Sequence, residues 1–155
     1  MINSESELKG FIFDVIKTIT ILDDKYIMYA NQALDYPKKE SFVVIDYSIE
    51  KSPLASVVAE NGAVISKVTI TCNVFGSRFL ADRIFNAKQL FDFSDSVISI
   101  ENGENPVNRT ELEAGGYLQR FDTSLILHLS INHSVADRAI GKELGEINIE
   151  NQSNN

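Results

Sequence analysis

The segment LQRFDTSLILHLSINHSV, residues 118–135, alternates between two classes of side chain. One parity is largely apolar, and the other is largely polar: Phe121, Thr123, Leu125, Leu127, Leu129, Ile131 and His133 against Arg120, Asp122, Ser124, Ile126, His128, Ser130 and Asn132. A period of two predicts an antiparallel strand with one buried and one polar face. Because a typical strand has about five or six residues, we expect this one to project beyond its own sheet.

Four shorter segments also have the composition of strands. Residues 26–29 and 97–100 are short apolar runs, and residues 42–49 are rich in Val and Ile, which predicts a strand buried on both faces near its start. In residues 64–75, Val68, Ile70, Cys72 and Val74 alternate with Thr69, Thr71 and Asn73. This alternation predicts one core face and one face that is wet or contacts a partner.

Two segments show helical periodicity. Residues 6–20 carry apolar side chains at spacings of three and four, with Ser4 or Ser6 as the expected N-cap. A second helix is expected to begin after the N-cap Ser77 and to run to about Leu90. The predicted fold class is therefore α+β: one mostly antiparallel or mixed sheet of four to five strands packed against two helices.

Two further segments lie outside these expected elements. Residues 101–116, ENGENPVNRTELEAGG, form an expected loop that is long for a compact domain, and long loops are often functional. Residues 137–155 end in NQSNN, a polar composition with little reason to fold alone. We expect one domain over residues 1–136 and a polar C-terminal tail over 137–155.

Composition narrows the classes of function. The chain has 155 residues, 44% of them hydrophobic, and a formal net charge of −8, which disfavours specific nucleic-acid binding because that depends on clustered Lys and Arg. The single cysteine, Cys72, leaves no intrachain disulfide or Cys-based metal site. The polar N-terminus does not match a signal peptide, and no apolar run is long enough to span a bilayer.

The residues that could carry catalysis are few. His128 and His133 are five residues apart on one expected strand, so they point to opposite faces. No EF-hand loop, phosphate-binding loop or dinucleotide fingerprint occurs. We therefore predict no catalytic residue, no cofactor and no metal, and a protein that is not an enzyme. A remote alternative is a small enzyme or ligand-binding domain with a site of Asp122, Ser124 and His128, which share one face.

Two segments, taken together, resemble a known family. They are YANQALDYPKKESFVVI at residues 29–45 and VTITCNVFGSRFLADRIF at residues 68–85. With a leading helix, a late loop and a final alternating strand opened by Arg120, the chain resembles the phage neck and tail-terminator family over nearly its whole length. It departs from the family pattern in the charged residues Lys38, Lys39 and Glu40 and in the polar tail after Val135.

This resemblance implies a structural virion protein of the tail and neck, assembled in the host cytoplasm. It implies a homo-oligomeric ring, expected to be a hexamer, that caps the tail tube, stops its polymerisation and joins the tail to the head–neck connector. The implied partners are other copies of the chain, the tail tube protein, the sheath protein and the neck connector, with no membrane. The resemblance also makes the loop 101–116 a candidate contact arm and the tail 137–155 an intersubunit or neck contact arm. The alternative within this class is a head–tail connector or tail-completion protein at another position in the neck.

The expected contact residues are polar, basic or turn-forming. The amides of Asn31 and Gln32, the loop residue Pro37 and five basic side chains form this set: Lys38, Lys39, Arg78, Arg109 and Arg120. Arg83 belongs to the same candidate intersubunit ion pairs. DNA is expected only as cargo that passes through the ring, where an acidic lining would repel phosphate.

Overall fold

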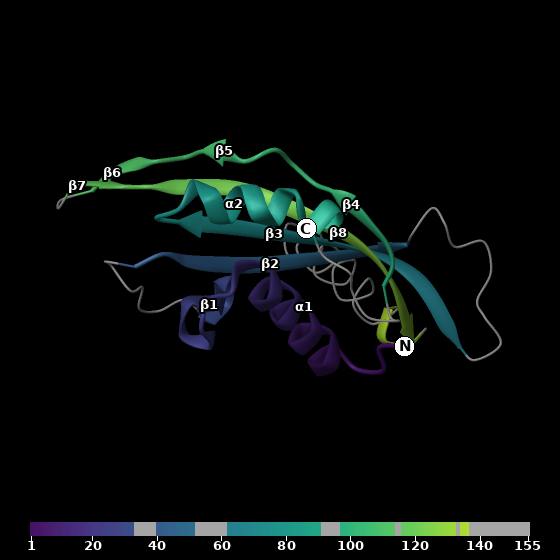
Figure 1. Cartoon of the computed structure of the whole chain (residues 1–155). Helices are drawn as coiled ribbons and strands as arrows, with labels where there is room; N and C mark the ends of the chain where they lie inside the picture. Colours follow the sequence, from purple (N-terminus) through teal and green to yellow (C-terminus); the bar gives the residue numbers. More distant parts are fainter. Residues whose placement is uncertain (33–39, 52–61, 91–96, 114–115, 133, 137–155) are drawn as a thin grey trace, which may run out of the picture.

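The computed structural model describes residues 1–32, 40–51, 62–90, 97–113, 116–132 and 134–136. Within these ranges the chain forms one mixed sheet with two principal helices on one of its faces, which confirms the α+β class. Figure 1 shows the sheet curving along its length, with the helices α1 (Glu5–Thr20) and α2 (Arg78–Phe85) against it. The predicted tail, residues 137–155, lies outside the described residues.

Helix α1 begins and ends with specific backbone hydrogen bonds. The Ser4 hydroxyl accepts a hydrogen bond from the Glu7 amide, so Ser4 is the N-cap. The side chains that α1 buries recur at helical spacing: Leu8, Ile12, Val15, Ile16, Ile19 and Thr20. Ile21 ends the helix in the left-handed conformation, with its N–H donating to the Lys17 carbonyl at 2.8 Å.

The main sheet has the strand order β1-β2-β3-β8-β4, and β5 also pairs with β8. These strands are β1 (Ile27–Tyr29), β2 (Phe42–Lys51), β3 (Ala63–Phe75), β4 (Val97–Asn102), β5 (Val107–Asn108) and β8 (Arg120–Asn132). The β1–β2 pair is parallel, and the other pairs are antiparallel. The predicted long strand is therefore β8, which pairs over all thirteen of its residues with β3 at the centre of the sheet.

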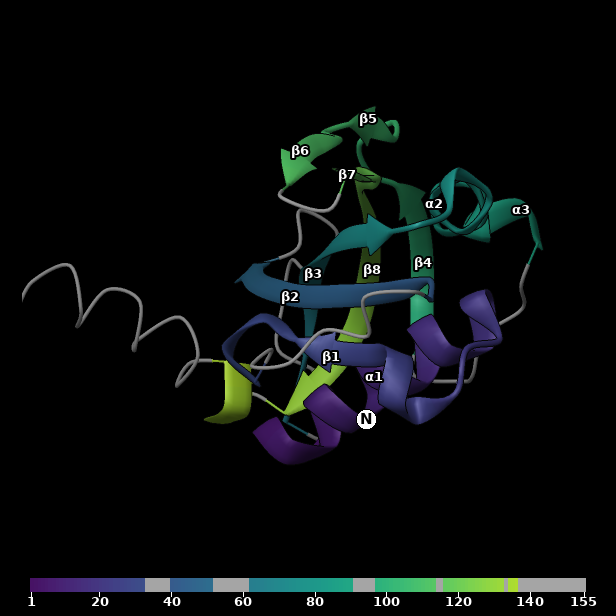
Figure 2. The same ribbon diagram turned by 90° about the vertical axis from the view of Figure 1, so that its left-hand side faces the viewer.

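The core lies between the helices and one face of the sheet. On β8 this face carries Phe121, Leu125, Leu127, Leu129 and Ile131, opposite Val68, Ile70, Cys72 and Val74 of β3. Figure 2 shows α1 and α2 together on this side of the strands. Helix α1 also packs against β1, where the Tyr29 hydroxyl donates to the Lys9 carbonyl at 2.6 Å. Burial raises the pKa of Tyr29, with smaller contributions from Tyr47 and Asp46.

The first residues of the chain close the sheet beside β8. Ile2 forms a parallel bridge with Ile131: its N–H donates to the Ser130 carbonyl, and its carbonyl accepts from the Asn132 N–H. Only 2% of Ile2 is exposed, so the N-terminus is fixed to the last long strand. Segments more than a hundred residues apart in sequence therefore lie side by side.

The second predicted helix is two helices. It breaks at Asn86, so α2 ends at Phe85 and α3 (Ala87–Leu90) follows. The Asn86 amide side chain donates to the Asp82 carbonyl at 2.9 Å, and its backbone N–H donates to the same oxygen. The break itself is a change of backbone angles, because Asn86 has φ −92° and ψ 15°, outside the helical region.

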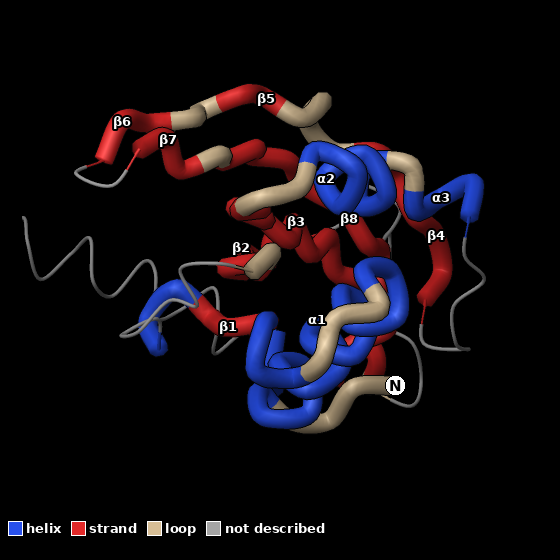
Figure 3. The backbone as a smooth tube through the Cα atoms, turned by 60° about the vertical axis from the view of Figure 1, so that its left-hand side comes forward, coloured by secondary structure: helices blue, strands red, loops and turns tan. Residues whose placement is uncertain are grey.

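The interpretation of residues 101–116 as a loop is wrong. This segment completes β4, forms β5 and enters β6 (Glu111–Glu113), which pairs with β7 (Gly116–Leu118) in a separate two-stranded sheet. Figure 3 shows this β6–β7 hairpin extending beyond the ends of the neighbouring strands. Gly and Asn are depleted in strands, so the composition of the segment did not indicate strands. Within it, β4 and β5 form because they pair with β8.

The expectation of one buried and one polar face on β8 holds only in part. Ser124 and His128 belong to the polar parity, yet their exposed fractions are 4% and 1%. The backbone at Gly103 crosses directly over Ser124, and the Glu101 carboxylate reaches His128. Alternation identifies the faces of a strand but cannot show which neighbouring segments cover them.

Candidate functional site

Two predicted contact residues, Arg109 and Arg120, meet at Asp122. Arg120 Nε and Nη2 donate to the two Asp122 carboxylate oxygens at 2.8 and 3.1 Å. Arg109 Nε lies 3.8 Å from Asp122 Oδ2. Arg120 and Asp122 are two residues apart on β8, so their side chains leave the same face of the sheet. This cluster joins the start of β8 to the residue that follows β5.

A row of side chains crosses the sheet next to this cluster, on the face that carries no helix. Phe42, Phe75 and Arg120 are cross-strand neighbours on β2, β3 and β8. The two phenyl rings are stacked with centroids 4.6 Å apart, and the Arg120 guanidinium lies 5.8 Å from the Phe75 centroid. Sequence reasoning missed this row because strand register is needed to align the three residues.

The other predicted contact residues lie elsewhere. Arg78 opens α2 after the N-cap Ser77, with its side chain 74% exposed and Nε 4.0 Å from Asp82 Oδ2. Asn31 and Gln32 are exposed in the short helix η2 (Ala30–Gln32) that follows β1. The predicted sites at Pro37, Lys38 and Lys39 lie outside the described residues. The structure therefore unites only Arg109 and Arg120.

The trio considered for an enzyme does not converge. Asp122, Ser124 and His128 share the expected face of β8, but Ser124 and His128 are four residues apart, about 14 Å along an extended strand. The Ser124 hydroxyl accepts from the Glu104 N–H at 2.7 Å, while His128 Nε2 lies 3.3 Å from Glu101 Oε1. A serine nucleophile and its base must lie within hydrogen-bond reach, and this pair does not. His133 lies outside the described residues.

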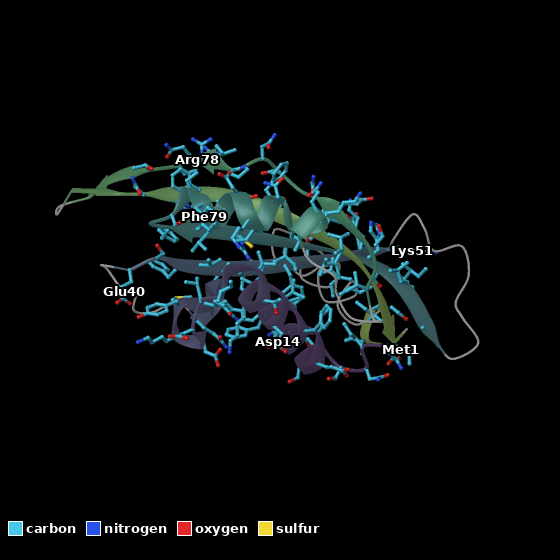
Figure 4. All side chains as sticks on the ribbon, viewed as in Figure 1. Met1, Asp14, Glu40, Lys51, Arg78 and Phe79 are labelled. Atoms are coloured by element: carbon cyan, nitrogen blue, oxygen red, sulfur yellow. The ribbon has the colours of Figure 1, made fainter. Side chains whose placement is uncertain are left out.

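Two exposed apolar residues, Ile21 at the C-cap of α1 and Phe79 in the first turn of α2, are linked through Arg83. We define the helix-end patch as Ile21, Phe79, Arg78 and Arg83. Ile21 is 77% exposed and Phe79 is 68% exposed. Arg83 connects the two helices because its Nε donates to the Ile19 carbonyl at 2.8 Å and its guanidinium lies 5.9 Å from the Phe79 ring. Figure 4 shows Arg78 and Phe79 at the start of α2.

Sequence reasoning identified the two arginines of this patch but neither apolar residue. One signal in the sequence could have identified Ile21. A helix commonly ends at Gly or Asn in the left-handed conformation, and neither residue follows the helical pattern here. An isoleucine at such a position indicates that its side chain has another use.

The β6–β7 hairpin prolongs the β5–β8 pairing beyond the other strands of the sheet. Its two strands pair as Glu111 with Leu118, Leu112 with Tyr117 and Glu113 with Gly116. In the described part of the chain, neither strand pairs with the main sheet. The Arg109 N–H donates to the Arg120 carbonyl at 2.7 Å between the two pairings, so the hairpin continues the pairing of β5 with β8 in the same register.

Three properties relevant to chemistry can be stated for the described residues. Burial raises the pKa of the Cys72 thiol to about 12, which suppresses the reactive thiolate. No group of three or more His, Cys, Asp or Glu side chains in these ranges could hold a metal ion. None of the helices within them is long and apolar enough to cross a membrane.

Comparison with known proteins adds no assignment. No protein-family model matches the chain, and no curated protein matches it significantly.

Proposed function

We propose that this chain is the subunit of a phage tail-terminator ring. In this proposal, copies of the chain form a closed ring, a hexamer, at the head-proximal end of the tail tube. The ring stops tube polymerisation, binds the neck connector and lets DNA pass through its channel. The resemblance of residues 29–45 and 68–85 to the terminator family motivates the proposal.

One structural observation supports an assembling subunit most directly. The β6–β7 hairpin extends from the end of the sheet and pairs with itself alone in the described ranges (Figures 1 and 3). A ring of more than two identical copies is built from head-to-tail contacts, in which one surface of a subunit meets a different surface of the next. A projecting hairpin can supply main-chain and side-chain contacts to a neighbour without disturbing the sheet that carries it.

The acidic balance of the chain agrees with transit of DNA. A net charge of −8 disfavours persistent binding of phosphates, so a channel formed by such subunits would let DNA move. Reversing the charge of residues that line the channel should therefore slow DNA ejection. If such variants eject DNA at the wild-type rate, the proposed role of the acidic channel lining is wrong.

The deciding experiment compares particles made with and without the protein. Electron micrographs of particles that lack it should show overlong tails without heads, because nothing stops the tube. Tails of normal length would refute the terminator assignment and favour a connector. The mass of the purified protein, measured with and without tube protein, should reveal a discrete multimer, and a monomer under both conditions would contradict a ring.

Two deletions test the arms. Replacing residues 111–118 with a short Gly linker should prevent assembly yet leave the fold intact, because β8 keeps its pairing with β3. Deleting residues 137–155 should weaken ring formation or neck docking. Wild-type assembly by either deletion would exclude that arm as a contact.

A further inference from the structure

The helix-end patch has an unusual backbone at Ile21. Its φ is 59° and its ψ is 24°, and in the described ranges no other non-glycine residue has a positive φ. This conformation is unfavourable for a β-branched residue, and glycine usually occupies it. Because 77% of Ile21 is exposed, packing within the subunit offsets little of that cost. The side chain is therefore better explained by a contact outside the subunit.

The neighbouring residues are of the types that dominate protein interfaces. Phe79 is 68% exposed, and the guanidinium of Arg83 lies 5.9 Å from its ring. Aromatic and arginine side chains are enriched at interfaces relative to other surfaces. Phe79 and Ile21 come from two different helices that Arg83 ties together, so the patch is presented on fixed secondary structure.

The charge of the patch restricts its partner. Arg78 and Arg83 are the basic residues of α2, and Asp82 is its acidic residue. Two copies meeting through the same patch would bring their arginines together, which is unfavourable. The partner surface should therefore be acidic and apolar, and the chain as a whole is strongly acidic.

The β6–β7 hairpin has the matching composition. Residues 111–113 and 116–118, ELE and GYL, contain two glutamates, two leucines and a tyrosine, with no lysine or arginine. We infer that the hairpin of one copy docks on the helix-end patch of the next copy, an inference that rests on the proposed ring. This contact is head-to-tail, as a cyclic ring with more than two subunits requires.

Ile21→Gly provides a test with opposite effects on folding and assembly. Glycine accepts the left-handed conformation, so the melting temperature of the isolated subunit should rise by about 2–4 °C. Loss of the side chain should weaken assembly at least tenfold, measured as the midpoint of multimer formation by light scattering. A substitution that merely damaged the fold would lower both quantities.

Phe79→Ala and a matched control test the location of the contact. Truncating a central interface aromatic should weaken assembly by about 30-fold. The control is Ile98→Thr, which removes a 50% exposed isoleucine at the bulge of β4 and should leave assembly unchanged. Equal loss in both variants would overturn the assignment of the contact to the patch.

Cross-linking tests the pairing of the two surfaces. Phe79→Cys and Leu118→Cys, the latter paired with Glu111 on the face that carries both glutamates, are prepared separately in a Cys72→Ala background and mixed under mild oxidation. A disulfide dimer containing one chain of each kind supports the inference. Its absence in a mixture that forms multimers overturns the contact but leaves the ring in place. Absence of both multimer and cross-link overturns both.

Discussion

Replacing Gly103 with alanine should destabilise the protein although no unusual backbone angle is involved. A Cβ at this position would collide with the Ser124 hydroxyl, the Ser124 carbonyl oxygen and its carbonyl carbon. Two of these three atoms belong to the backbone of the central strand, which cannot move without disturbing its pairing with β3. The segment between β4 and β5 must therefore shift.

The magnitude follows from the contacts that this shift would disturb. The Glu104 N–H donates to Ser124 Oγ at 2.7 Å, and Thr123 Oγ1 donates to the Glu104 carbonyl at 2.8 Å. Each hydrogen bond contributes about 1 kcal/mol, and overpacking typically costs about 1–3 kcal/mol. We expect the free energy of unfolding to fall by about 2–3 kcal/mol, or roughly 5–10 °C in melting temperature for a chain of this size.

Urea and thermal unfolding measure this effect, and the chain offers a matched control. Gly10→Ala introduces the same methyl group within α1, where a Cβ meets nothing within 4 Å. This substitution should stabilise the protein by about 0.5–1 kcal/mol because alanine favours the helix. The same chemical change thus has opposite signs at the two positions.

The double variant Gly103→Ala with Ser124→Ala separates the side-chain collision from the backbone collision. Removing the hydroxyl cannot relieve contact with the Ser124 carbonyl, so most of the loss should persist. Full recovery would show that the hydroxyl alone obstructs the methyl group. Wild-type stability of Gly103→Ala would refute the close crossing over Ser124 altogether.

Three other predictions concern the core, a helix end and the arginine cluster. Because burial raises the pKa of the Cys72 thiol from 9.0 to about 12, its stabilising contribution is complete below pH 9 and is lost as pH rises toward 12. The free energy of unfolding, measured with urea, should therefore fall less between pH 8 and pH 10.5 for Cys72→Ala than for wild type. An equal fall in both proteins would contradict this. Ser4→Ala should cost about 1 kcal/mol in the same assay and Ser6→Ala much less, whereas equal costs would exclude Ser4 as the cap. Asp122→Ala should cost about 1 kcal/mol at low salt and less in 1 M NaCl, since the carboxylate is partly exposed and screened; a loss independent of salt would refute an electrostatic role for its pairing with Arg120.

The elements governed by local pattern could be predicted from sequence. Alternation located β8, helical spacing located α1, and the hydroxyl of Ser4 marked the start of that helix. These signals depend on neighbouring residues alone, so the sequence displays them directly. The break at Asn86 was missed because one residue with non-helical backbone angles leaves the spacing of the apolar residues unchanged.

The contacts between distant segments could not be predicted in the same way. The stacking of Phe42 on Phe75 depends on strand register, and the burial of Ser124 depends on a crossing segment with loop-like composition. The helix-end patch depends on how α1 and α2 approach each other. Among the predicted contact residues that the structure describes, only Arg109 and Arg120 share a partner, Asp122, and Lys38 and Lys39 lie outside the described residues.

The central place of β8 has a consequence for the timing of synthesis. Residues 120–132 fill the gap between β3 and β4, so the ribosome must release nearly the whole domain before the sheet can close. Contacts so distant in sequence also slow folding. A nascent chain that stops before Arg120 would leave long strand edges open, which favours aggregation and chaperone capture. The complete sheet therefore forms only in chains that include β8, the strand that pairs with both β3 and β4.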